Sequence, residues 1–140
     1  MIHPLRQAKF AEKVDAAFWS WYTSNMDKKF HPVVSVRIFG EQKCFGPGVA
    51  ELLRRVRESK SLRAASIAMG MAYSKAWTIV KNAESELGCK LLVSSTGGKN
   101  GGGAVLSPEA EQILAAYEEY CAALRHFAQE EFSRRFSNIL

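Results

Sequence analysis

The sequence predicts a mainly α-helical protein that also contains two small β-hairpins. Apolar residues recur at spacings of three and four over most of the chain, as they do on one face of a helix. They alternate with polar residues only over short stretches next to glycines, as in a hairpin. The predicted order is helix, hairpin, three helices, hairpin and helix. A chain of 140 residues has the length of one domain and can bury a single core.

Residues 1–30 are predicted to form an N-terminal amphipathic helix, which covers about residues 5–24. Its apolar stripe is rich in aromatic residues, and charged side chains lie between them. A helix this short does not fold alone in water, so the stripe needs a surface to cover, either the main core or a second copy of the chain. We predict that the stripe contributes to a dimer interface through Phe10, Val14, Phe18 and Trp21.

The central segment, residues 31–107, begins with a predicted hairpin over about 33–45. Val34, Val36 and Ile38 alternate with polar residues there and precede a glycine turn and a short return strand. The sequence Gly-Pro-Gly that follows ends this hairpin.

A helix is predicted over about residues 48–59, because its apolar residues recur on one face. Its three arginines, Arg54, Arg55 and Arg57, lie outside that face. A run of charge on a helix is usually solvated surface, and we predict that these arginines are solvated.

A helix-turn-helix motif is predicted over residues 61–88. Ser61 is a suitable N-cap for a short alanine-rich helix, and Gly70 supplies a turn. A longer helix then runs from about 72 to 87 and ends at Gly88. Such a pair can place its second helix in the major groove of DNA, but helix pairs with a glycine between them also occur in plain bundles. The spacing alone leaves both readings open.

The stretch "SSTGGKNGGGAVLS" at 94–107 is predicted to be the tip and return strand of a second hairpin. Apolar residues flank its glycines on both sides, at 90–93 and 104–107, so a flexible linker is less favoured. A phosphate-binding P-loop is excluded, because Asn100 stands where a hydroxyl residue would follow the lysine. A hairpin directly after a helix-turn-helix is the arrangement of a winged helix. The fold class is therefore a winged helix-turn-helix with flanking N- and C-terminal helices.

Residues 108–140 are predicted to form a long C-terminal helix. Ser107 provides the cap and Pro108 the first helical position. Its aromatic and leucine side chains recur at spacings of three and four, which is a seam able to pair with another helix. We predict that this seam contributes to dimerisation through Tyr117, Tyr120, Leu124 and Phe127.

The helix-turn-helix and the glycine-rich hairpin together resemble the DNA-binding domain of the ModE family of molybdate-responsive transcriptional regulators. The residues that carry the resemblance are "YSKAW" at 73–77 and "TGGK" at 96–99 with the glycines after it. It extends over roughly residues 33–125. It implies a bacterial winged helix-turn-helix protein that binds DNA as a homodimer. The chain departs from the family pattern at Ala72, Asn100 and Ala110.

Members of this family that sense molybdate do so in a C-terminal molybdate-binding domain. Because this chain ends at Leu140, we do not expect it to bind molybdate.

The predicted DNA contacts lie on the second helix of the motif, at the start of the first helix, and in the wing. Polar groups near the start of the second helix are expected at base edges or phosphates, and the lysines at phosphates. Glycines in the wing let the backbone approach the sugar-phosphate edge. For Tyr73 and Trp77, the alternative to a DNA contact is burial in the protein core. The predicted contacts are Ser61, Arg63, Tyr73, Ser74, Lys75, Trp77, Thr78, Lys81, Gly97, Gly98, Lys99 and Asn100.

The charge distribution agrees with a polyanionic partner without requiring one. The chain has a net charge of +5, residues 31–107 carry eleven Lys/Arg and five Asp/Glu, and residues 108–140 carry three and six. A positive field concentrates polyanions, although a solvated surface explains the same charge.

Several function classes are not supported by the sequence. The three cysteines and three histidines lack metal-ligand spacing, and no paired carboxylates or nucleophile with a base suggest an enzyme. We therefore expect no metal, no cofactor and no catalysis. No apolar run is long enough to cross a membrane and the first residues do not resemble a secretory signal, so we expect a cytoplasmic protein.

The predicted function is sequence-specific binding of double-stranded DNA by a homodimeric transcriptional regulator. The alternative is a winged-helix module for protein interaction or dimerisation that does not read DNA directly.

Overall fold

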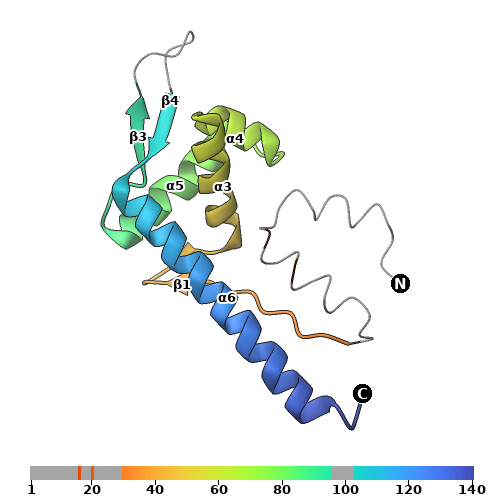
Figure 1. The fold of residues 1–140 in the computed structure, drawn as a ribbon. Coiled ribbons are helices and arrows are strands. Elements are labelled where there is room, and N and C mark those ends of the chain that lie inside the picture. The colour runs from red at the N-terminus through yellow and green to blue at the C-terminus, as the bar shows by residue number, and fades with distance from the viewer. Residues whose placement is uncertain (1–15, 17–19, 21–29, 96–102) are drawn as a thin grey trace. The chain divides into compact units, whose positions relative to one another are not determined.

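The computed structural model describes Ala16, Ser20 and residues 30–95 and 103–140, and it confirms a mainly helical fold with two small antiparallel hairpins (Figure 1). Residues 35–119 form one compact unit, and residues 120–140 belong to a second. Within the described residues no helix has the length and apolar character needed to cross a membrane. The elements are β1 Ile38–Phe39, β2 Lys43–Phe45, α3 Pro47–Ser59, α4 Leu62–Ala68, α5 Tyr73–Leu87, β3 Leu92–Ser95, β4 Gly103–Leu106 and α6 Pro108–Phe136.

The core of residues 35–119 is built around α3. One face of this helix is buried from Val49 to Val56, as the spacing of its apolar residues predicts. Residues from β2, from the start of the second hairpin and from α6 complete the core. The largest fully buried apolar side chains are Phe45, Leu52, Leu53, Val56, Leu91 and Leu114.

The first hairpin is shorter than the prediction of residues 33–45. Only β1 and β2 pair, and their register is irregular between Ile38 and Phe39. Val33 and Val34 are exposed, so the alternation of apolar residues has no buried face to support a strand there. The carbonyl of Val36 instead accepts a hydrogen bond from the hydroxyl of Tyr117 at 2.8 Å.

The arginines of α3 are not a purely solvated face, so that prediction is wrong for two of them. Glu51 is buried and pairs with Arg54 at 2.6 Å and with Arg55 at 2.8 Å. Arg54 also contacts Glu118 of α6 at 2.8 Å. Arg54 therefore links α3 to α6, and Arg57, which is about half exposed, pairs with Glu111 of α6 at 3.2 Å.

The helix-turn-helix agrees with the prediction in its boundaries and in its caps. The Oγ of Ser61 accepts a hydrogen bond from the backbone N–H of Ala64, and this caps α4. Gly70 and Gly88 both have a positive φ, at 67° and 71°, which residues with a Cβ adopt at a cost. The turn after α4 and the end of α5 therefore fall where the glycines predict them.

The second hairpin is displaced from the predicted stretches 90–93 and 104–107. The paired residues are Leu92–Ser95 and Gly103–Leu106, in regular register. The backbone N–H of Leu91 donates to the carboxylate of Glu84 at 2.8 Å. Ser107 caps α6 by accepting from Ala110 at 3.0 Å. Leu91 and Ser107, which lie within the predicted strands, thus form hydrogen bonds with α5 and α6.

The end of α3 is fastened to the second hairpin through Lys60. This residue is in the left-handed region, with φ 56°, and its N–H donates to the carbonyl of Val56 at 2.7 Å. Its carbonyl accepts from the N–H of Ala104 in β4 at 3.0 Å. A residue with a Cβ occupies a backbone conformation that favours glycine.

We expect Lys60→Gly to stabilise the protein by about 1 kcal/mol, because the left-handed conformation costs roughly that much for a residue with a Cβ. Urea denaturation would measure the difference in the free energy of unfolding. Gly88→Ala provides the opposite test, since Gly88 has φ 71° and open space around it. We expect Gly88→Ala to be destabilising. A Lys60→Gly variant that is less stable than the wild type would contradict the left-handed conformation assigned to Lys60.

The long helix α6 begins at the predicted cap, but one residue of the predicted dimer seam belongs to the core. Tyr117 is buried, and its ring packs edge-on against Phe45 with 5.0 Å between ring centroids. A side chain held in this way has no surface to offer a second copy. Of the predicted seam, Tyr120 and Phe127 are exposed and Leu124 is half-buried.

Candidate functional site

The candidate site is built on the exposed face of α5. Ala76, Val80 and Ala83 are buried on the side that faces the core, at the spacings of four and three that one face of a helix requires. The small alanine side chains allow α4 and α5 to approach closely. The opposite side of α5 is left for contact with another molecule.

Ser74, Lys75 and Thr78 lie fully on the exposed side of α5. The hydroxyl of Thr78 donates to the carbonyl of Ser74 at 2.9 Å. Its oxygen has two lone pairs, which can only accept, so Thr78 can accept from a donor group such as a base amino group. Ala72 stands at the N-cap and makes no side-chain hydrogen bond, as its residue type predicts.

Two aromatic side chains of α5 carry cations against their rings. The guanidinium carbon of Arg63, from α4, lies 4.7 Å from the ring centroid of Tyr73. The ammonium of Lys81 lies 5.3 Å from that of Trp77. The rings are 40% and 50% exposed, so the alternative of a place in the core is excluded for both. Each ring holds a positive group near the surface.

Glu84 was not among the predicted site residues, and it organises one end of this face. Its carboxylate is buried, accepts from the N–H of Leu91, and pairs with Lys81 at 3.0 Å. Burial disfavours the ionised carboxylate, but these hydrogen bonds outweigh it, and the pKa of Glu84 lies below its ordinary value. The hydrogen bond to Glu84 also raises the pKa of Lys81. Both groups are therefore charged at neutral pH.

The sequence contains a signal that would have found Glu84. It follows Val80 by four residues and therefore lies on the inward side of α5. A carboxylate at such a position needs partners, because an unpaired buried charge is costly. A charged residue at an inward position of a predicted helix therefore marks Glu84 as a residue with a specific partner.

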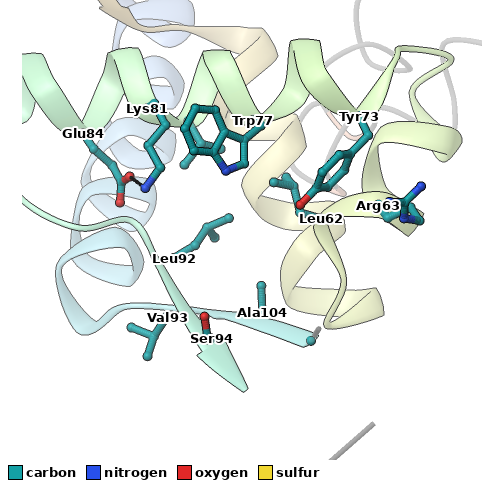
Figure 2. A pocket seen from close by; sticks show the side chains of 12 residues that line it. Leu62, Arg63, Tyr73, Trp77, Lys81, Glu84, Leu92, Val93, Ser94 and Ala104 are labelled. Atoms are coloured by element: carbon teal, nitrogen blue, oxygen red, sulfur yellow. Dashed lines mark hydrogen bonds and ion pairs between the residues drawn. The ribbon is translucent and has the colours of Figure 1, made fainter. Parts of the chain in front are cut away.

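A groove runs between α5 and the second hairpin, with a volume of about 340 Å³. Figure 2 shows Tyr73, Trp77 and Lys81 pointing from α5 toward the strands, with Val93, Ser94 and Ala104 on the opposite side. Arg63 lies beside Tyr73, and Glu84 lies beside Lys81. The lining residues are Leu62, Arg63, Tyr73, Trp77, Val80, Lys81, Glu84, Leu92, Val93, Ser94, Gly103 and Ala104.

Some predicted site residues fall outside the described residues. These are the wing residues Gly97, Gly98, Lys99 and Asn100, and the N-terminal residues Phe10, Val14, Phe18 and Trp21. The predicted residue Ser61 is half-buried, and its Oγ caps α4. Across the described part of the chain, no three His, Cys, Asp or Glu side chains form a group that could hold a metal ion.

Two helices joined by a glycine turn, followed by an antiparallel hairpin, define a winged helix-turn-helix. Residues 49–111 match the model of the bacterial regulatory helix-turn-helix protein family of the lysR type. This match and the similarity to two molybdenum-related proteins confirm the resemblance to ModE-type regulators.

Two curated relatives are similar to about half of this chain. The molybdenum-pterin-binding protein MopB of Rhodobacter capsulatus is 38% identical over 66 residues, which are 47% of this chain and 24% of the relative. The molybdenum transport protein ModE of Herbaspirillum seropedicae is 34% identical over 68 residues, 49% of this chain and 25% of the relative. The chain therefore spans about a quarter of the length of the curated relatives it matches.

Proposed function

We propose that this protein binds double-stranded DNA in a sequence-specific manner and regulates transcription, without catalysis. The observation that carries the proposal is the exposed polar and basic face of α5 within a domain of the regulatory helix-turn-helix family. In this arrangement the second helix of the motif enters the major groove. Ser74, Lys75 and Thr78 then face base edges and phosphates.

Residues 49–111 match the regulatory helix-turn-helix family, so DNA binding is the function that we extend to this chain. Their names refer to molybdenum, and we propose no molybdenum ligand for residues 49–111. A DNA-binding regulator acts where the DNA is, which in a bacterium is the cytoplasm.

The protein is proposed to act as a homodimer. The exposed aromatic residues Tyr120 and Phe127, with Leu124 between them, support pairing through α6. The predicted N-terminal stripe of residues 1–30 would add to the same interface. A two-fold dimer reads two half-sites about one helical turn apart, so its binding sites should be palindromic.

The loop that joins β3 and β4 is proposed to be a wing that contacts the DNA backbone. Its sequence has glycines on both sides of Lys99 and Asn100. Unhindered backbone N–H groups and one cation suit a phosphate contact.

Selection of bound sites from random duplex DNA, followed by binding titrations over a range of salt, tests the proposal. We expect Lys75→Gln and Lys99→Gln each to weaken binding to the selected duplex. Each should also lower the slope of log affinity on log salt by about 0.9, because one phosphate contact is lost. The control is Arg57→Gln in α3, a cation that pairs with Glu111 of α6 and is not among the predicted DNA contacts.

Failure of the wild-type protein to bind or enrich any duplex would contradict DNA binding and favour the alternative of a protein-interaction module. Enrichment of sites without palindromic symmetry would contradict the homodimer only.

A further inference from the structure

The groove between α5 and the β3–β4 hairpin has the chemistry of a nucleic-acid backbone seat. Its apolar lining includes Leu62, Leu92 and Ala104, and the half-exposed rings of Tyr73 and Trp77 form one side. Such a lining suits the carbon-rich surface of a deoxyribose ring, which presents few polar groups. The hairpin strands supply the other side, which Figure 2 shows facing α5.

Cations are placed at both ends of this aromatic row. Tyr73, Trp77 and Lys81 follow one another at intervals of four residues along α5, so the row is about 12 Å long. Arg63 lies at the Tyr73 end, and Lys81 forms the other end. Apolar surface between two cations complements a sugar-phosphate strand, in which sugars alternate with negative phosphates.

The cation at the second end is held in place by Glu84. One carboxylate oxygen accepts from the N–H of Leu91 at 2.8 Å, and the other pairs with Lys81. The carboxylate is buried, while the Lys81 side chain is 39% exposed. Both residues line the groove, but the positive partner is far more exposed there than the negative one.

We propose that this groove seats one sugar-phosphate strand of duplex DNA. Trp77 and Tyr73 pack against deoxyribose, Arg63 and Lys81 contact phosphates at the two ends, and Glu84 is a positioning residue for Lys81. This inference rests on the proposed DNA binding and assigns the two aromatic residues to the backbone, not to base edges. Ser74 and Thr78, on the exposed side of α5, then contact the base edges.

The test compares groove variants on a duplex selected by the wild-type protein. Arg63→Gln and Lys81→Gln should each lower the salt slope by about 0.9, because each removes one phosphate contact. Trp77→Ala should weaken binding by about tenfold without changing the slope, since it removes apolar contact and no charge. Trp77→Phe should retain most of the affinity, and thermal melting establishes that each variant is folded.

Two matched controls lie outside the groove. Arg57→Gln removes an exposed cation of α3, and Phe39→Ala removes an aromatic side chain of β1 that is 63% exposed. Neither is expected to change the affinity or the salt slope.

Glu84→Gln tests the positioning role, because glutamine can still accept from Leu91 but does not pair with the Lys81 ammonium. In the wild-type background, we expect this variant to have a lower DNA affinity and a smaller slope of log affinity on log salt. In a Lys81→Gln background, we expect no further effect. A purely structural role of Glu84 would instead lower the melting temperature and weaken binding equally in both backgrounds, and that result would overturn the positioning role.

The outcomes separate this inference from the proposed function. If the wild-type protein binds no duplex, DNA binding itself is wrong. If it binds, and Lys75→Gln weakens it while Arg63→Gln, Lys81→Gln and Trp77→Ala do not, DNA binding stands and the backbone seat is overturned.

Discussion

Ser74→Asp is expected to lower the affinity for duplex DNA by about 100-fold or more while the protein stays fully folded. Ser74 is exposed in the first turn of α5, where DNA is proposed to approach. A carboxylate there would face the phosphates and base acceptors, and like charges brought together at an interface cost several kcal/mol. Each 1.4 kcal/mol corresponds to a tenfold change in affinity.

The same substitution should not harm the helix. The first turn of α5 contains no acidic residue, and Ala72 gives it no side-chain cap. A negative charge at this end interacts favourably with the helix dipole and contributes about 0.3–1 kcal/mol. We therefore expect an unchanged or slightly higher melting temperature together with loss of binding, a combination that unfolding does not produce.

Binding isotherms and thermal melts of the same samples measure both effects. Ser133→Asp is the matched control, since it introduces the same charge on the exposed side of α6 outside the helix-turn-helix. It should bind DNA like the wild type. Full binding by Ser74→Asp would show that the start of α5 does not face DNA.

Phe45→Ala is expected to reduce the free energy of unfolding by about 3–5 kcal/mol, the usual cost of removing a large aromatic side chain from a core. Phe45 is completely buried and packs edge-on against Tyr117. Its loss removes apolar contact between β2 and α6 and leaves a cavity. The hydrogen bond from Tyr117 to Val36 loses its support at the same time.

Urea denaturation of Phe45→Ala and Phe39→Ala provides the measurement. Phe39 belongs to the same hairpin but is largely exposed, so its removal should change the stability by less than about 0.5 kcal/mol. A loss below about 1 kcal/mol for Phe45→Ala would show that the first hairpin is not part of the core.

The helices of the DNA-binding motif could be predicted from the sequence because their signals are local. Ser61 caps α4, Ser107 caps α6, and Gly88 ends α5, each through contacts with residues a few positions away. The inward side of α5 follows from the spacing of its alanines and valine, since helical periodicity fixes which residues share a face. The candidate DNA-contacting residues are those that lie on the other side of α5.

Two of the failed predictions, those for Arg54 and Tyr117, depended on contacts between segments far apart in the chain, whereas Arg55 pairs with Glu51 only four residues away. Arg54 pairs with Glu118 and Tyr117 reaches Val36, across sequence separations of 64 and 81 residues. No local pattern indicates such partners. The prediction of a solvated surface was therefore wrong for Arg54, and the predicted dimer seam does not include Tyr117 as an exposed residue.

By itself, the sequence determined the helix-turn-helix, its caps, its turn glycines and the side of α5 that is free, because periodicity and capping depend on neighbouring residues. Only the tertiary structure decided that Glu84 also accepts from the N–H of Leu91, that Tyr117 is buried, and that two aromatic rings of α5 face the second hairpin across a groove. These features arise where α5, α6 and the hairpins meet, and side-chain packing between distant segments sets which charges pair and which rings remain exposed.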